Sequence, residues 1–257
     1  MVEPMPAGLD PDRTLTLLWR HVVPVPRGSR GPEQRTSVDE VVRTAVAVAD
    51  EEGLGALSMR RVAERLGLTV MSLYTCVRSK DELVALMIDQ VAGEEPLPEL
   101  APTLRARLRD ITQLIWEECR RHPWLLLAQT SRPVPGPNLS DRYEWQVSAL
   151  EGFGFTDVDL DQIVTLLTGF ATGAARSLVD SELVRARSGL SDAQWWEINS
   201  PILERLMPAE RYPVSRRVGT SAGQAYNAAS DPVRSFEFGL DRVLDGIEAF
   251  TDRARAR

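Results

Sequence analysis

The chain has 257 residues, of which 43% are hydrophobic and 26% are charged, and it contains 17 glycines and 17 prolines. This composition excludes a disordered, collagen-like or low-complexity protein and favours a folded chain of one or two domains. The formal net charge is −7, and this excess of acid would repel nucleic acid if it were spread evenly along the chain.

Residues 1–34 are predicted to form an extension and linker that contains one short helix. Leu15, Leu18 and Trp19 follow Pro11 at a spacing that indicates an amphipathic helix. Proline and glycine then interrupt residues 24–32. The arginines of this linker have two open interpretations, a solvated linker or added contacts to phosphates or a minor groove, and they are Arg27, Arg30 and Arg35.

Three short helices are predicted between residues 37 and 76. A hydroxyl side chain that can cap the helix stands at the start of each, and glycines at 53 and 67 end the first and second. Acidic residues three positions after Ser37 and Ser79 predict capping boxes for the first helix and for a fourth, which leads out of the unit. The predicted caps are Ser37, Ser58, Thr69 and Ser79.

Positive charge concentrates in this unit. Residues 58–80 contain five basic side chains and one acidic side chain, although the chain as a whole is acidic. A basic face on an acidic body can hold a polyanion at one place and repel it elsewhere. Chance fluctuation of charge in a short window is the alternative interpretation.

Longer helices are predicted after the proline-rich break at residues 96–102. Apolar residues recur at helical spacing, and no segment alternates with the period of a strand. The glycine-, serine- and alanine-rich segment 208–230 is predicted to be a connection without helix. The predicted helices are 103–121, 123–130, 139–153, 159–187, 191–207 and 232–253.

These patterns predict an all-α protein with two domains, 35–95 and 96–257. Two cysteines, Cys76 and Cys119, are too few for a disulfide framework, and the first residues lack the apolar segment of a signal peptide. The longest apolar stretch, residues 163–175, is shorter than the about 20 residues that span a bilayer. We therefore expect a cytoplasmic protein without a membrane partner.

A helix of about nine residues, a turn at Gly67 and a helix of about seven residues have the outline of a helix-turn-helix. Apolar residues such as Val62, Leu66 and Leu73 would hold the two helices, and short or polar side chains would face the base edges. An ordinary corner between two helices is the alternative. The predicted DNA face comprises Thr69, Val70, Met71, Ser72, Tyr74 and Thr75, flanked by Ser58, Arg60 and Lys80.

The stretch from Leu57 to Leu83 resembles the DNA-binding domain of TetR/AcrR-family transcriptional regulators. The landmarks that agree in spacing are Ala63, Leu66-Gly67, Leu73-Tyr74, Lys80 and Leu83. The resemblance implies that residues 69–72 begin the recognition helix. It implies that Ser58 and Arg60 lie near the DNA backbone and a base edge, and that Tyr74 and Lys80 bind phosphates. This chain has Thr75 and Cys76 where many members have an aromatic residue and a histidine, which removes one potential phosphate donor.

Base preference is only partly suggested by the residue types. Val70 and Met71 offer apolar contact that suits a thymine methyl group, whereas the guanidinium of Arg60 suits guanine.

The same resemblance implies that residues 96–257 form a domain that binds a small-molecule effector and dimerises. His122-Pro123-Trp124 is also similar to the C-terminal domain of the tetracycline-repressor branch. Aromatic candidates for the effector site are Trp116, Trp124, Trp145 and Phe170. Candidates for the dimer interface, which fit the core of a single protomer equally well by pattern, are Ile163, Leu167, Phe170, Phe236, Leu240, Val243, Leu244 and Ile247.

The sequence thus predicts a sequence-specific regulator, most simply a homodimeric repressor that a small effector releases from a double-stranded operator. No cofactor, metal or catalytic residue is expected, because neither a phosphate-binding loop nor a nucleophile motif is present. The alternative is a helical small-molecule-binding protein or an enzyme that does not act on DNA.

Overall fold

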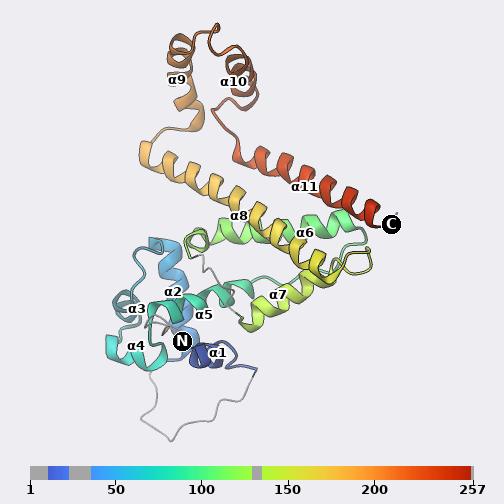
Figure 1. The fold of residues 1–257 in the computed structure, drawn as a ribbon. Coiled ribbons are helices and arrows are strands. Elements are labelled where there is room, and N and C mark those ends of the chain that lie inside the picture. Colours follow the sequence, from blue (N-terminus) through green and yellow to red (C-terminus); the bar gives the residue numbers. More distant parts are fainter. Residues whose placement is uncertain (1–10, 23–35, 129–134, 256–257) are drawn as a thin grey trace, which may run out of the picture.

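The computed structural model describes residues 11–22, 36–128 and 135–255, and every regular element in these ranges is a helix (Figure 1). The predicted all-α class is confirmed. Among the described residues, no helix combines the length and the apolar character that a bilayer span requires. The linker arginines for which contacts to DNA were one interpretation, Arg27, Arg30 and Arg35, lie outside the described residues.

The N-terminal unit consists of five helices, and the last four of them start at the predicted caps. The hydroxyl groups of Ser37, Ser58, Thr69 and Ser79 each accept a hydrogen bond from the backbone N–H three residues later. Each cap satisfies one of the free N–H groups at a helix start. The helices are α1 (Pro11–Leu18), α2 (Val38–Glu52), α3 (Met59–Leu66), α4 (Val70–Cys76) and α5 (Lys80–Ala92).

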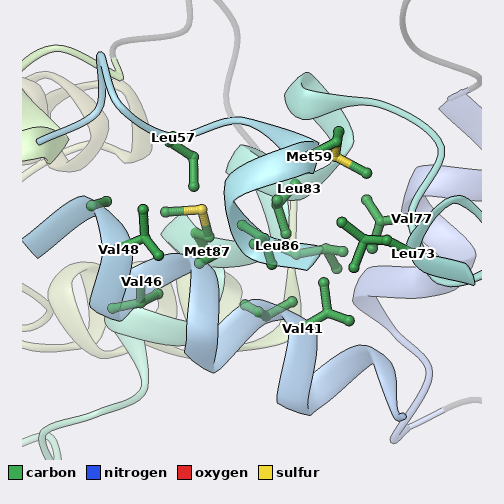
Figure 2. Close-up of a cluster of buried hydrophobic side chains, with 14 of the residues drawn as sticks. Val41, Val46, Val48, Leu57, Met59, Leu73, Val77, Leu83, Leu86 and Met87 are labelled. Atoms are coloured by element: carbon green, nitrogen blue, oxygen red, sulfur yellow. The ribbon is translucent and has the colours of Figure 1, made fainter. Parts of the chain in front are cut away.

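One apolar core holds this unit together (Figure 2). Val41 of α2, Leu73 of α4 and Leu83 of α5 are fully buried, and Figure 2 shows them converging from three helices. An isolated helix of seven residues such as α4 would be marginal in water. Packing of Leu73 and Cys76 therefore keeps α4 helical and leaves Met71, Tyr74 and Thr75 exposed.

The second unit is built around α6, α8 and α11, which share a core of buried leucine, isoleucine and aromatic side chains. Ion pairs reinforce this core, because Arg105 of α6 binds Asp241, Asp245 and Glu248 of α11. The elements are α6 (Leu104–Arg121), the 3₁₀ helix η1 (Pro123–Leu126), α7 (Pro137–Ser148), α8 (Asp157–Ser188), α9 (Asp192–Leu206), α10 (Pro213–Tyr226) and α11 (Pro232–Arg255).

The prediction that residues 208–230 lack helix is wrong, because they contain α10. Glycine in this segment allows close packing: a Cβ at Gly223 would lie 2.6 Å from Cε2 of Trp196 in α9. Helices α9 and α10 form a hairpin beyond the end of α8 (Figure 1). Two other predicted helices also differ. At 123–130, whose last two residues lie outside the described residues, Pro123 starts a 3₁₀ turn that ends at Leu126, and the helix predicted over 139–153 ends at Ser148.

Candidate nucleic-acid interface

The α3–α4 corner lies at the outer end of the N-terminal unit, away from the α6–α8–α11 core (Figure 1). Gly67 ends α3 in the left-handed conformation, with φ of 65°, and its N–H bonds to the carbonyls of Ala63 and Glu64. This conformation is strained for residues with a Cβ, so glycine permits the tight turn. Thr69, two residues after Gly67, then caps the start of α4.

The outward face of α4 presents apolar and hydroxyl side chains. Met71 is 75% exposed and Tyr74 is 41% exposed, and neither supports the core. Thr69 and Thr75 are also exposed, whereas Val70 and Ser72 are half-buried at the foot of the helix. The six predicted residues of α4 and its cap therefore lie together on one protruding surface.

Internal hydrogen bonds fix the orientation of the hydroxyl groups on this surface. Oγ1 of Thr69 accepts from the N–H of Ser72 at 3.2 Å and lies 2.8 Å from the Ser72 hydroxyl. The Thr75 hydroxyl donates to the carbonyl of Ser72 at 2.6 Å. Each hydroxyl retains lone-pair or donor capacity for a further partner.

The predicted flanking residues surround the same surface. Ser58 is exposed at the start of α3, and the Arg60 side chain is 83% exposed although its Nε binds Glu64 at 2.9 Å. The Nζ of Lys80 donates to the carbonyl of Leu54 at 3.2 Å, which holds the ammonium group beside the α2–α3 turn. Exposed ion pairs such as Arg60–Glu64 are weak, so Arg60 can exchange its partner for a phosphate or base.

Two of the five basic residues in the segment 58–80 have a different task. Arg61 binds Glu52, and Arg65 binds Glu51 and Glu52, so both arginines tie α3 to the end of α2. Hydrogen bonds to Glu52 raise the pKa of Arg61, and hydrogen bonds to Glu51 and Glu52 raise the pKa of Arg65. The positive charge available on the α3–α4 surface is therefore smaller than the sequence count indicates.

A buried histidine joins the two units. The side chain of His122, at the end of α6, is 5% exposed and lies between two carboxylates. Its Nδ1 is 2.8 Å from Oδ1 of Asp50 in α2, and its Nε2 is 3.0 Å from Oε2 of Glu94 after α5. The indole N–H of Trp124 donates to the same Asp50 oxygen at 2.8 Å. This cluster connects the end of α6 to α2 and to the segment that follows α5.

A second joint connects α5 with α7. The Asp89 carboxylate of α5 accepts from the N–H of Leu139 at 3.0 Å and from the side-chain amide of Asn138 at 3.3 Å. Burial raises the pKa of Asp89, and these hydrogen bonds oppose the rise. Arg142 of α7 binds Glu118 of α6 at 2.8 Å and donates to the carbonyl of Ala92 at 2.9 Å.

We expect Gly136→Ala to disrupt the α5–α7 joint. A Cβ at Gly136 would lie 2.8 Å from the Cβ of Asp89 and closer still to its carboxyl group. The Asp89 side chain cannot easily move away from the added methyl group, because α7 binds its carboxylate. Such overpacking costs about 1–3 kcal/mol of unfolding free energy. Urea denaturation followed by circular dichroism measures the loss, with Gly169→Ala, where a Cβ meets nothing within 4 Å, as control. Equal stability of the two variants would contradict the tight joint.

The four aromatic candidates for an effector site lie in three places. Trp116 stacks on Phe236 with ring centroids 4.0 Å apart, and Phe170 lies 5.8 Å from the same ring, so α6, α8 and α11 meet there. Trp145 borders this core from α7 and donates to the carbonyl of Pro98 at 2.9 Å. Trp124 is apart from them, in the core of the N-terminal unit.

Most of the dimer-interface candidates are buried inside the protomer. Six of the eight, at positions 163, 167, 236, 240, 244 and 247, are at most 6% exposed and pack among α6, α8 and α11. Phe170 and Val243 are half-buried. Exposed apolar side chains of α8 and α11 include Leu166 at 50%, Phe238 at 65% and Phe250 at 38%. A groove of about 440 Å³ between the two helices is lined in part by Leu166 and Phe250.

Sequence reasoning missed the residues that join the units. His122, Asp50 and Glu94 are distant in the chain, and no local pattern pairs them. A signal was available for Asp89, because a carboxylate among the apolar residues of α5 needs a partner when it is buried.

Comparison with known proteins agrees with this geometry. A family model described as bacterial regulatory proteins, tetR family, matches residues 35–87, and one described as the tetracyclin repressor-like C-terminal domain matches residues 97–251. The HTH-type transcriptional repressor DrrR1 of Streptomyces coeruleorubidus is 39% identical over 245 residues, which are 95% of this chain and 87% of that protein.

Solved structures show the same architecture. Apo ActR from Streptomyces coelicolor is 27% identical, with a TM-score of 0.68, over 88% of this chain and 100% of ActR. ActR in complex with actinorhodin is 28% identical, with a TM-score of 0.70, over 84% of this chain and 96% of ActR.

Proposed function

The chain belongs to the TetR family of bacterial regulatory proteins, and we propose that it is a homodimeric repressor that a small effector releases from its operator. The observation that carries the proposal is the α3–α4 surface. A short helix, fixed to the core by Leu73 and Cys76, presents exposed apolar and hydroxyl side chains between cationic flanks. A protein surface of this shape fits the major groove of DNA.

In the proposed complex, α4 lies in the major groove. Met71 and Val70 contact thymine methyl groups, and the hydroxyls of Thr69, Ser72 and Thr75 bind base edges or phosphates. Ser58, Tyr74 and Lys80 bind the backbone, and Arg60 leaves Glu64 for a phosphate or a guanine. Two copies related by a two-fold axis would place their α4 helices in successive major grooves of a palindromic site.

The dimer interface is assigned to the exposed faces of α8 and α11. Leu166 and Phe250 border the groove between these helices, Phe238 extends the apolar surface along α11, and solvent exposure of such a patch is unfavourable. The half-buried Val243 also lines the groove. The six buried candidates support the dimer indirectly, by fixing α8 against α11.

The effector site is assigned to the aromatic cluster of Trp116, Phe170 and Trp145. These residues surround the meeting point of α6, α8 and α11, and α6 ends at the His122 joint. Ligand binding beside α6 could therefore move the N-terminal unit. The effector must prefer the conformation that does not bind DNA, since equal affinity for both conformations would shift nothing.

Selection from a randomised duplex library tests the proposal. We expect the purified protein to enrich a palindromic sequence and to bind it more tightly than unrelated DNA, in a salt-dependent manner. Actinorhodin, which is bound to ActR in a solved complex, is the first effector probe to add to the selected duplex. Failure to enrich any sequence at low salt would overturn the proposal.

Tyr74→Ala combined with Lys80→Ala is expected to weaken binding to all duplexes by a similar factor. Both side chains are assigned to phosphates, so their removal should lower the slope of log K against log salt by about one for the lost cationic contact. Fluorescence anisotropy at several salt concentrations measures the slope. Arg120→Ala is the control, because Arg120 pairs within its own helix with Glu117. An unchanged slope in the double variant would remove Lys80 from the interface.

We propose that the chain acts in the cytoplasm as a transcriptional regulator and is not an enzyme. The alternative of an enzyme is less favoured, because the chain matches a transcriptional repressor over 95% of its length. Turnover of a metabolite without affinity for DNA would favour the enzyme.

A further inference from the structure

Helix α1 precedes both segments that match the family models, yet it is part of the folded N-terminal unit. Leu18 is 2% exposed and belongs to the same core as Leu73 of α4 and Leu83 of α5. Thr14 is also buried, at 8% exposed. Figure 1 shows α1 beside α4 and α5. The helix is therefore an added element of the unit that carries the DNA face.

The guanidinium of Arg13 lies at the C-terminal end of α4. Its Nη2 donates to the carbonyl of Cys76, the last residue of α4, at 3.2 Å. The last carbonyls of a helix lack partners within the helix and carry partial negative charge, which a cation stabilises. The last turn of α4 contains no basic residue of its own. Arg13 therefore supplies the missing cation from another helix.

Glu82 extends this contact to the turn between α4 and α5. Its carboxylate is 3.3 Å from Nε of Arg13 and accepts from the backbone N–H of Arg78 at 2.6 Å. The Glu82 side chain is 4% exposed, so water competes little for these bonds. Arg13 thus fixes both the end of α4 and the turn that follows it.

The other end of α1 reaches the second unit. The indole N–H of Trp19 donates to the carbonyl of Pro135, directly before α7, at 2.7 Å. Arg20 donates from Nε to Asp39 at the start of α2 at 3.0 Å. Residue 136, next to Pro135, packs against Asp89, so Trp19 adds a third segment to the α5–α7 joint.

We infer that α1 is a strut that positions the recognition helix relative to the effector unit. Arg13 and Trp19 are positioning residues in this assignment, because they act through α4 and the segment before α7 and do not contact DNA. The inference deepens the proposed function, since a fixed spacing of the two recognition helices matters only for a dimer that reads DNA. A movement of α7 would be transmitted to α4 by two routes, through α1 and through α5.

Two substitutions separate the two ends of the strut. Arg13→Met retains much of the side-chain length without the charge, and we expect roughly tenfold weaker binding to the selected operator duplex with an unchanged salt slope. The matched control is Arg120→Met, which also removes one positive charge but lies on α6. Trp19→Phe retains a ring but loses the N–H donor, and its control is Trp195→Phe on the exposed face of α9.

Spin labels at Met71→Cys report the spacing of the two recognition helices in the free dimer. Met71 is 75% exposed, whereas Cys76 and Cys119 are both buried, so the label enters the introduced site. We expect Trp19→Phe to broaden the distance distribution between the two labels and Trp195→Phe to leave it unchanged. Thermal unfolding of each variant identifies any general loss of structure.

Three results would overturn the strut. Operator affinity of Arg13→Met within twofold of Arg120→Met would show that the cap has no effect on α4. A salt slope lowered by about one would show that Arg13 binds a phosphate directly. Equal distance distributions for the two tryptophan variants would show that α1 does not link the units. If the unsubstituted protein selects no operator, the proposed function fails, and the spin-label comparison still tests the strut.

Discussion

Replacement of Phe238 by arginine is expected to convert the proposed dimer into a folded monomer, whereas the same replacement at Phe236 is expected to unfold the protein. The two residues are two positions apart on α11, which places them on nearly opposite faces of the helix. Phe238 is 65% exposed, and Phe236 is 2% exposed between the rings of Trp116 and Phe170.

The difference follows from the cost of the charge on each face. An arginine at 236 would lose its hydration without a partner in the apolar core, which costs about 3–5 kcal/mol or more. That cost is comparable with the whole stability of many domains, about 5–15 kcal/mol. An arginine at 238 remains hydrated in the monomer and is desolvated only when two copies meet. Operator affinity should then fall about 100-fold or more, because one recognition helix no longer holds the other near the DNA.

Light scattering coupled to size-exclusion chromatography measures the oligomeric state, and circular dichroism reports the fold. Val214→Arg on α10 is the control, because Val214 is 61% exposed and lies off the α8–α11 face. A dimeric Phe238→Arg variant would place the interface elsewhere. The hairpin of α9 and α10 would be the next surface to test, because Ile198, Ile202 and Leu206 are exposed on it.

Met71→Glu is expected to lower operator affinity by at least about 100-fold without changing stability. Met71 is the most exposed large apolar side chain of α4 and contributes nothing to the core. A carboxylate there would face the phosphates that line the groove, and juxtaposed like charges cost several kcal/mol, at about 1.4 kcal/mol for each factor of ten. Met71→Ala should cost much less, because it loses only apolar contact.

Anisotropy titration with the selected duplex measures the affinity of each variant. Leu127→Glu is the control, because Leu127 is 67% exposed after η1 and the substitution adds the same charge away from α4. If Met71→Glu and Leu127→Glu weakened binding equally, the loss would reflect net charge alone. The assignment of α4 to the major groove would then be wrong.

Local chemistry made much of the fold predictable. The caps at Ser37, Ser58 and Thr69 each have a short-range cause, and the structure contains all three. The sequence did not predict α10, because the residue type alone does not distinguish a glycine that permits helix packing against Trp196 from a glycine in a loop.

The candidate site was predictable only where it is local. Residues of α4 share one short helix, so their spacing places them on one surface. The role of Arg61 and Arg65 was not predictable from charge, because their partners Glu51 and Glu52 belong to the preceding helix. On α8 and α11 more apolar residues face the protomer core than face solvent, so the apolar periodicity of the sequence identified the core residues and not the exposed ones.

The joints at His122 and Asp89 have a mechanical consequence. Helix α5 leads into the segment that connects the two units, yet Asp89 in its last turn, Ala92 at its end and Glu94 just after it are each bound by a residue of the second unit. Because these bonds restrain the end of α5, this segment cannot act as a flexible hinge. The N-terminal unit is therefore expected to rotate as a rigid body about this joint, and a small tilt of α6 or α7 would be amplified at α4, which lies at the outer end of the unit.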